Sequence, residues 1–165
     1  MNEPRPKRKP TRLKGHDYSR PGWYFVTVCT LNRERCLSEV VGRGLLDAPR
    51  IRLTPYGEWT EEALRFLDAQ SEYIRVDKYV IMPNHIHVLL EVKPGGASGK
   101  PRPTNALVPK FFSSLKRYTD RQAGRPIWQT TYYDHIVRDE EDYQRIWSYI
   151  ETNPAKWEED PYYAP

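Results

Sequence analysis

Two histidines that flank an isoleucine, His85 and His87, are the first residues of this sequence that could do chemistry. If the segment is a β-strand, their side chains project from the same face, with Cα atoms about 6.5–7 Å apart. Both imidazoles can then reach one ion, because borderline divalent ions accept imidazole ligands readily. The pair therefore indicates a metal site, and the alternative interpretation is two unrelated histidines on one strand.

A tyrosine and an asparagine near the C-terminus, Tyr149 and Asn153, form a second candidate pair. Their spacing of four places them one turn apart on one face of a helix. The Asn153 carbonyl oxygen could be a third metal ligand, and the Tyr149 phenol could be a nucleophile. The alternative is a half-buried tyrosine followed by an Asn-Pro helix stop. A rival nucleophile is Tyr118, which lies in a basic segment.

The phenol of a tyrosine becomes a nucleophile only when it is activated. Its ordinary pKa is about 10, so a cation or base must lie nearby. A divalent ion held by the two histidines could polarise a phosphodiester and stabilise the charge that develops on it. Attack by the phenol would leave a phosphotyrosine and a free hydroxyl, and rejoining would need no nucleotide. The sequence contains no P-loop or glycine-rich nucleotide motif, which agrees with such a reaction.

Hydrophobic periodicity and boundary residues predict the elements that must position these side chains. Strands are predicted at residues 23–31, 73–82, 85–92 and 128–137, with a short extended piece at 50–53. Helices are predicted from Thr54-Pro55 to about residue 69, from about residue 105 to Gly124, and from Asp139 to Pro154. The order β, α, β, β, α, β, α predicts an α+β fold: a ferredoxin-like or RRM-like sandwich, in which an antiparallel sheet carries helices on one face.

Composition excludes several classes of protein. The chain has 165 residues and a mean hydropathy of −0.82, and it contains no run of the roughly 18 apolar residues that a membrane helix needs. Cys29 and Cys36 have no metal or redox spacing, so a disulfide scaffold is excluded. No secretory signal is visible, and we expect a cytoplasmic protein. The predicted organisation is a basic arm at 1–21, one catalytic domain at 22–157 and a tail at 158–165.

The net charge of +4 conceals a segregated pattern. The arm is basic, whereas residues 139–165 hold eight acidic and two basic residues. Basic side chains in the arm and on one side of the middle helix are candidates for phosphate contacts. These candidates for DNA binding are Arg8, Lys9, Lys110, Lys116, Arg117 and Arg121. The alternatives are a solubilising arm and a solvated helix face.

Three blocks of sequence together resemble a known family. MPNHIHVLLE at 82–91 resembles the HUH motif of single-tyrosine transposases of the insertion-sequence type. WQTTYYDHIVRDEEDYQRIWSYIETNPAKW at 128–157 resembles the C-terminal signature of one branch, the REP-associated tyrosine transposases, where REP denotes repetitive extragenic palindromes. HDYSRPGWYFVTVCTLNRERC at 16–36 is similar to the first strand of that branch. The blocks span nearly the whole domain.

The resemblance implies an endonuclease and transposase that cleaves and rejoins single-stranded DNA at hairpins through a covalent 5'-phosphotyrosine. It implies that Tyr149 is the nucleophile and that His85, His87 and Asn153 hold Mg²⁺ or Mn²⁺. Relatives act as monomers or homodimers, so both states stay open. The signature residues Tyr132, Tyr133 and His135 are interpreted mainly as sheet and core residues, with DNA contact as the alternative.

Two other functions remain open at this point. One is a hairpin DNA- or RNA-binding module of the same fold that no longer cuts. The other is a structural protein stabilised by zinc at the two histidines.

Overall fold

The structure is a computed structural model that describes residues 16–42, 48–95 and 106–163. The strands are β1 (Gly22–Cys29), β2 (Ser38–Val41), β3 (Arg50–Leu53), β4 (Ile74–Ile81), β5 (His85–Val92) and β6 (Tyr133–Ile136). The helices are α1 (Pro55–Gln70), α2 (Leu107–Ala123) and α3 (Glu140–Thr152), with short 3-10 segments η1 (Leu31–Arg33) and η2 (Asn153–Glu159). Across these residues, no helix combines the length and apolar character needed to cross a membrane.

The main sheet has four strands in the order β4-β5-β1-β6, and every neighbouring pair is antiparallel. The two central strands are therefore β5 and β1. In the sequence they are separated by β2, β3, α1 and β4. This order is the one that two interleaved βαβ units produce, and it confirms the predicted α+β sandwich of ferredoxin-like type. The hairpin predicted around Pro83-Asn84 joins β4 to β5.

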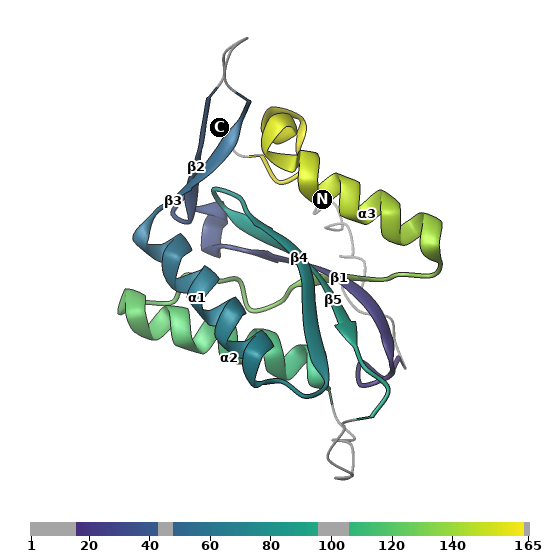
Figure 1. Ribbon diagram of the computed structural model, residues 1–165. Coiled ribbons are helices and arrows are strands. Elements are labelled where there is room, and N and C mark those ends of the chain that lie inside the picture. The colour runs from purple at the N-terminus through teal and green to yellow at the C-terminus, as the bar shows by residue number, and fades with distance from the viewer. Residues whose placement is uncertain (1–15, 43–47, 96–105, 164–165) are drawn as a thin grey trace, which may run out of the picture.

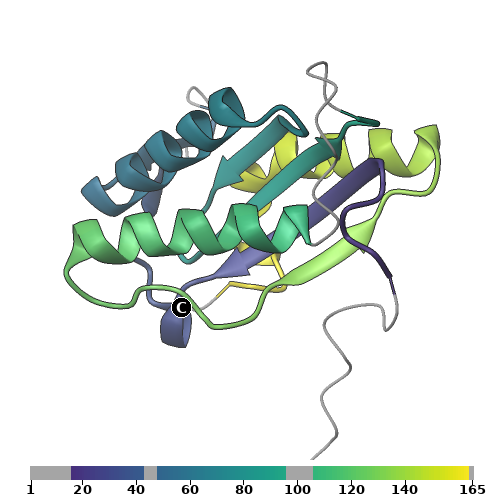
Figure 2. The ribbon, with the colours of Figure 1, turned by 90° about the horizontal axis from the view of Figure 1, so that it is seen from below.

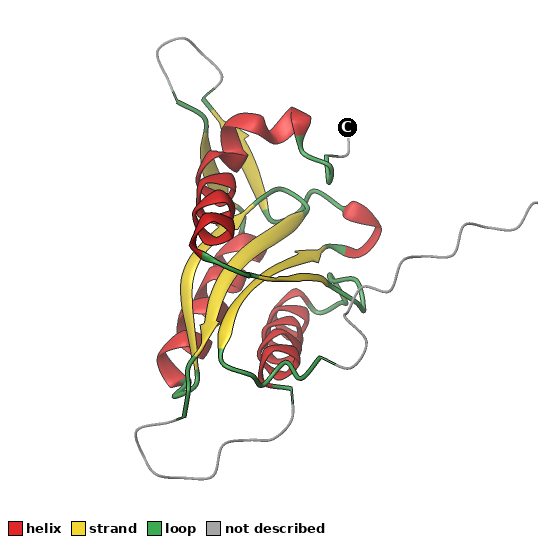
Figure 3. Cartoon of the chain, turned by 90° about the vertical axis from the view of Figure 1, so that its right-hand side faces the viewer, coloured by secondary structure: helices red, strands yellow, loops and turns green. Residues whose placement is uncertain are grey.

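The helices cover both faces of the main sheet, and this corrects the prediction that they lie on one face. Helices α1 and α2 pack side by side on one face (Figures 1 and 2). Helix α3 packs on the other face (Figure 3). Its residues Ile146 and Ile150 belong to one core cluster with Phe25 and Leu89 of the sheet. The apolar stripe of α3 shows only that the helix is buried on one side, so the sequence did not reveal which sheet face it covers.

The predicted boundary residues form the helix caps. The Thr54 hydroxyl accepts a hydrogen bond from the Gly57 amide, and the Asp139 carboxylate accepts one from the Asp142 amide. Each cap satisfies an amide that the first turn of a helix leaves unpaired. Gly124 ends α2 with a φ of 66°, a left-handed conformation that favours glycine. Local signals in the sequence thus fixed where these helices begin or end.

A second, two-stranded sheet formed by β2 and β3 lies outside the main sheet. The extended piece predicted at 50–53 is β3, whereas its partner β2 was not predicted. Cys36 and Leu37 connect this ribbon to α1, because the Leu37 carbonyl accepts hydrogen bonds from the Thr54 amide and hydroxyl. The ribbon is therefore anchored at the start of α1.

Gly57 is the position in α1 where a side chain has no room. A Cβ atom there would lie 2.1 Å from the Leu37 carbonyl oxygen. Gly57→Ala should therefore lower the free energy of unfolding by about 1–3 kcal/mol through overpacking, despite the better helix propensity of alanine. Denaturant titration measures this loss. The control is Arg65→Ala, at an exposed position of the same helix, and its free energy of unfolding should stay within about 0.5 kcal/mol of the unmodified protein. Equal losses in Gly57→Ala and Arg65→Ala would contradict the packing argument.

Candidate active site

Strand β5 brings the two histidines together on the α3 side of the sheet. Residues alternate along the strand: Ile86 and Val88 pack in the core beneath α1 and α2, and His85 and His87 project from the opposite face. Both imidazoles are fully buried, at 0% and 1% exposure. Their Nε2 atoms lie 3.0 Å apart. The predicted convergence of the two side chains on one point is therefore present in the structure.

Each histidine has a hydrogen-bond partner on its other ring nitrogen. His85 Nδ1 lies 2.8 Å from the Asn84 side-chain oxygen, and the Asn84 amide nitrogen donates to the Tyr162 carbonyl. This orientation of Asn84 makes His85 Nδ1 the donor, so Nε2 carries the lone pair that can bind an ion. His87 Nδ1 lies 2.8 Å from the Thr27 hydroxyl, which can donate or accept. Partners of this kind fix the orientation of metal-ligating imidazoles.

The phenol of Tyr149 reaches the histidine pair from α3. Its oxygen lies 3.3 Å from His87 Nε2 and donates a hydrogen bond of 3.1 Å to Asp160 Oδ2. The Tyr149 ring packs edge-on against Phe25 and His87. The side chain is half-buried, so it is held by the core and still reaches a groove.

Asn153 lies one turn after Tyr149 and is buried in the same cluster. Its side-chain nitrogen donates to Asp160 Oδ2 over 2.7 Å. Its side-chain oxygen is buried and has no hydrogen-bond partner among the described residues. A buried carbonyl oxygen without a partner is costly, and an ion would be one way to satisfy it. The predicted role of Asn153 as a ligand stays a prediction.

Asp160 is the residue of this site that sequence reasoning missed. Its carboxylate is buried, and Oδ2 lies 3.9 Å from the Nε2 atoms of both His85 and His87. Asp160 falls in the predicted tail at 158–165, outside the predicted catalytic domain. The aromatic residues around it, Trp157 and Tyr162, were the available signal, because a solvated tail rarely carries large apolar rings.

The pKa values of the cluster are shifted in directions that its burial and charges explain. Burial lowers the pKa of His85 and of His87, so both imidazoles are held neutral. Burial would raise the pKa of Asp160, but hydrogen bonds from the Asn153 side chain and the Tyr162 amide, with the nearby imidazoles, outweigh it and lower this pKa. Burial and the Asp160 charge both raise the pKa of Tyr149. The phenol therefore keeps its proton unless a cation opposes the carboxylate.

The donor set fits a divalent ion. His85, His87 and Asp160 each offer one ligand atom, and the three atoms lie within 4.8 Å of one another. The separation of 3.0 Å between the imidazole nitrogens matches neighbouring ligands of an octahedral ion with bonds of about 2.1 Å. Two neutral nitrogens and one carboxylate suit Mn²⁺ better than Mg²⁺, which prefers oxygen.

A groove of about 330 Å³ opens beside the cluster, and we call it the Tyr149 groove. Its floor is Phe25, Thr27 and His87; its walls are Tyr133 and His135 of β6, Arg145, Ile146 and Tyr149 of α3, and Pro161 with Tyr162. Of the signature residues considered above, Tyr132 is buried in the core as expected, whereas Tyr133 is 50% exposed and lines this groove.

Asp142 joins the two walls of the Tyr149 groove. Its carboxylate lies 2.7 Å from His135 Nε2 and pairs with the Arg145 guanidinium. Burial would raise the pKa of Asp142, but hydrogen bonds from His135, Arg145 and the Arg138 amide lower it to about 2. Helix α3 is therefore tied to the edge strand β6 at its first turn.

This contact predicts a pH dependence of stability. The folded pKa of Asp142, about 2, lies below the ordinary value of about 3.9. The ionised carboxylate thus stabilises the fold above about pH 4, and its contribution is lost as the pH falls through the folded pKa. Thermal unfolding should show Asp142→Asn to be less stable than the unmodified protein at pH 6, with the difference shrinking toward pH 2. An equal difference in thermal stability at pH 6 and at pH 2 would refute this role of Asp142. The control is Glu141→Gln, which removes a neighbouring acidic charge of the same helical turn.

The basic residues predicted to bind DNA are not brought to this site. Lys110, Lys116, Arg117 and Arg121 lie on α2, which packs on the sheet face opposite α3. Lys116 donates to the carbonyls of Gln129 and Thr130, and the other three are exposed. The rival nucleophile Tyr118 is also on α2 and donates to Glu62. Arg8 and Lys9 lie outside the described residues.

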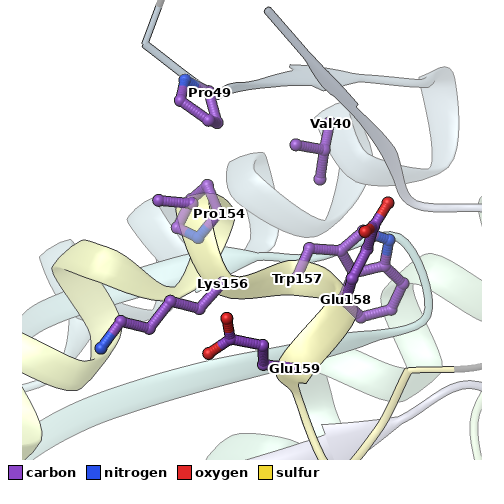
Figure 4. Close-up of a pocket in the computed structure, with 8 residues that line it drawn as sticks. Val40, Pro49, Pro154, Lys156, Trp157, Glu158 and Glu159 are labelled. Carbon is purple, nitrogen blue, oxygen red and sulfur yellow. The ribbon is translucent and has the colours of Figure 1, made fainter. Parts of the chain in front are cut away.

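A separate pocket of about 380 Å³ lies between the β2–β3 ribbon and η2 (Figure 4). Val40 and Pro49 face it from the ribbon side, and the labelled residues of η2 line the other side. Those residues are Pro154, Lys156, Trp157, Glu158 and Glu159. Neither the histidines nor Tyr149 line it, so it is distinct from the Tyr149 groove.

Comparison with known proteins gives relatives in sequence and in structure. No protein-family model matches the chain. A protein of Haemophilus influenzae described as uncharacterized is 28% identical over 174 residues, covering 95% of this chain and 93% of its own. The REP-associated tyrosine transposase of Escherichia coli is 25% identical over 81 residues, 49% of this chain and 44% of its own.

A solved structure shows the same fold. It is described as a REP-associated tyrosine transposase bound to a REP hairpin, and it superposes with a TM-score of 0.58. The match covers 82% of this chain and 68% of that one at 22% identity. The resemblance that the sequence blocks indicated is thus confirmed: the chain is similar to the REP-associated tyrosine transposases in sequence over about half its length and in fold over most of it.

Proposed function

We propose that the protein is a transposase that cleaves and rejoins single-stranded DNA at hairpin sequences, through a divalent ion and a tyrosine nucleophile. The observation that carries the proposal is the meeting of the Tyr149 phenol with His87 and Asp160, at 3.3 and 3.1 Å. This oxygen reaches a buried cluster of ligand atoms from a different element of the fold. The names of the relatives support a role in transposition.

The residues of the cluster have distinct roles in this proposal. His85, His87 and Asp160 would hold the ion, with the unpartnered oxygen of Asn153 as a further ligand. Mg²⁺ or Mn²⁺ bound there would polarise the scissile phosphate and stabilise its developing charge. Because His85 and His87 are held neutral by burial, both remain available as ligands near neutral pH.

Tyr149 then carries out the covalent step. Its oxygen forms a bond to phosphorus while the bond from phosphorus to the 3' oxygen breaks, leaving a 5'-phosphotyrosine and a free 3' hydroxyl. The phenolic proton passes to water, and the leaving 3' oxygen takes a proton from water, so the step balances. The hydrogen bond to Asp160 holds the phenol in position before the attack. The reverse reaction rejoins DNA with no external energy source.

The test is the covalent adduct. The purified protein is incubated with a labelled DNA hairpin carrying single-stranded flanks, with and without Mn²⁺, and run on a denaturing gel. A protein–DNA band that depends on the metal supports the proposal. Tight, salt-sensitive binding without such a band would replace it by the non-catalytic binding module.

A further inference from the structure

The Tyr149 groove presents one large exposed ring, that of Tyr133. Four large hydrophobic side chains are exposed among the described residues, and Tyr133 is the one that lines this groove. The neighbouring Tyr132 is 6% exposed and packs in the core, as the alternation of a strand requires. Edge strand β6 therefore directs the Tyr133 ring away from the core beneath α1 and α2 and into the groove that His87 and Tyr149 also line.

The register of the sheet places this ring in line with the metal ligands. Tyr133 pairs with Thr27 of β1, and Thr27 pairs with His87 of β5. Residues opposite one another project from the same face, so the three side chains form one row across the sheet. With strands about 4.8 Å apart, the Cα atoms of Tyr133 and His87 are separated by about 10 Å. The ring thus lies close beside the position of a phosphate attacked by Tyr149.

The charged side chains of the groove are already paired. His135 and Arg145 both contact the Asp142 carboxylate. The first turn of α3 also carries the acidic residues Glu140 and Glu141. Their negative charge would repel several consecutive phosphates along this wall of the groove. An aromatic ring is the recognition element that remains, and aromatic rings bind the faces of nucleobases.

We propose that Tyr133 is a stacking platform for one unpaired nucleobase beside the phosphate that Tyr149 attacks; this inference rests on the proposed function. A base inside a duplex has both faces covered by its neighbours, so this platform selects an unpaired nucleotide at the cleavage junction. An aromatic residue that projects from a four-stranded sheet is a known way to bind single strands. Because every base has a π-face, the contact tolerates different sequences.

The experiment measures DNA binding by a variant that lacks the proposed nucleophile, so that no cleavage occurs during the titration. Tyr149→Phe protein is titrated with a labelled DNA hairpin that carries a single-stranded thymidine flank, and each flank position is made abasic in turn. One abasic position should weaken binding about tenfold or more, the scale of one lost stacking contact. Tyr133→Thr, which keeps the β-propensity of the edge strand, should weaken binding of the intact DNA to the same extent. At that abasic position it should cause no further loss.

Controls separate stacking from a loss of folding. Tyr133→Trp should restore binding to the intact DNA, and Phe66→Ala should leave it unchanged. Phe66 is a still more exposed ring, at 63%, but it lies on α1 on the far side of the sheet. Equal circular dichroism and melting temperature of the variants show that the fold is retained.

The possible failures are distinguishable. If no flank position depends on Tyr133, the stacking platform is refuted even when the Tyr149-intact protein forms its adduct. If Tyr133 and one base are coupled but the intact protein forms no adduct, the platform stands and the catalytic function fails. Absence of any DNA binding by either protein refutes both.

Discussion

Tyr149→Phe should abolish the covalent protein–DNA adduct and reduce hairpin cleavage by about 10⁶-fold, the scale of removing the nucleophile from a covalent catalyst. The phenol oxygen is the atom that meets His87 and Asp160. The ring itself contacts Phe25 and His87, and phenylalanine preserves those contacts. Binding of the hairpin should therefore change less than about tenfold. A denaturing gel measures the adduct, and fluorescence anisotropy measures binding.

The matched control is Tyr118→Phe. Tyr118 is the rival nucleophile from the sequence, and its hydroxyl donates to Glu62 on the α1–α2 side of the sheet. This variant should form the adduct at the normal rate. Cleavage retained by Tyr149→Phe but lost in Tyr118→Phe would move the nucleophile to α2 and overturn the site described above.

Replacing both histidines by alanine should remove the response to metal altogether. The unmodified protein should gain about 2.7 kcal/mol of stability when Mn²⁺ is present at 100 times its dissociation constant, because a ligand that binds only the folded state stabilises it. The variant His85→Ala/His87→Ala should show no rise in melting temperature with Mn²⁺ and no adduct. Differential scanning calorimetry measures the rise, and a chelator should reverse it in the unmodified protein.

Two further variants decide which oxygen completes the metal site. If Asp160 and Asn153 both bind the ion, each of Asp160→Asn and Asn153→Ala should weaken Mn²⁺ binding by more than the roughly 10–100-fold that the loss of an outer partner costs. A large loss in only one of the two variants would identify that residue as the oxygen ligand, and a large loss in Asn153→Ala alone would agree with the ligand set that the sequence resemblance implies. Equal affinity of both variants and the unmodified protein would show that neither oxygen binds the ion.

The sequence predicted the parts of this site that follow from local periodicity. The spacing of His85 and His87 required only that residues 85–92 form a strand, and β5 has those bounds. Tyr149 and Asn153 required only a helix that begins at the Asp139 cap. Alternation and capping act over a few residues, so they can be read from the chain without knowledge of its tertiary structure.

The parts that depend on tertiary structure were not accessible in this way. Asp160 reaches the cluster only because η2 continues the chain after Pro154 and returns it toward β5. No periodic pattern in the sequence predicts that the chain turns back toward β5 at this point. The same reason explains the wrong prediction for α3: an apolar stripe identifies the buried side of a helix but not the layer against which it packs.

The placement of α2 and α3 on opposite faces puts two sets of charged side chains on opposite sides of the sheet. Lys110, Arg117 and Arg121 are exposed on one side, while Glu140, Glu141 and Asp142 begin the helix on the other. The exposed basic side chains of α2 therefore lie on the sheet face opposite Tyr149. If the protein cleaves DNA as proposed, a strand held by α2 would have to pass around an edge of the sheet to reach Tyr149.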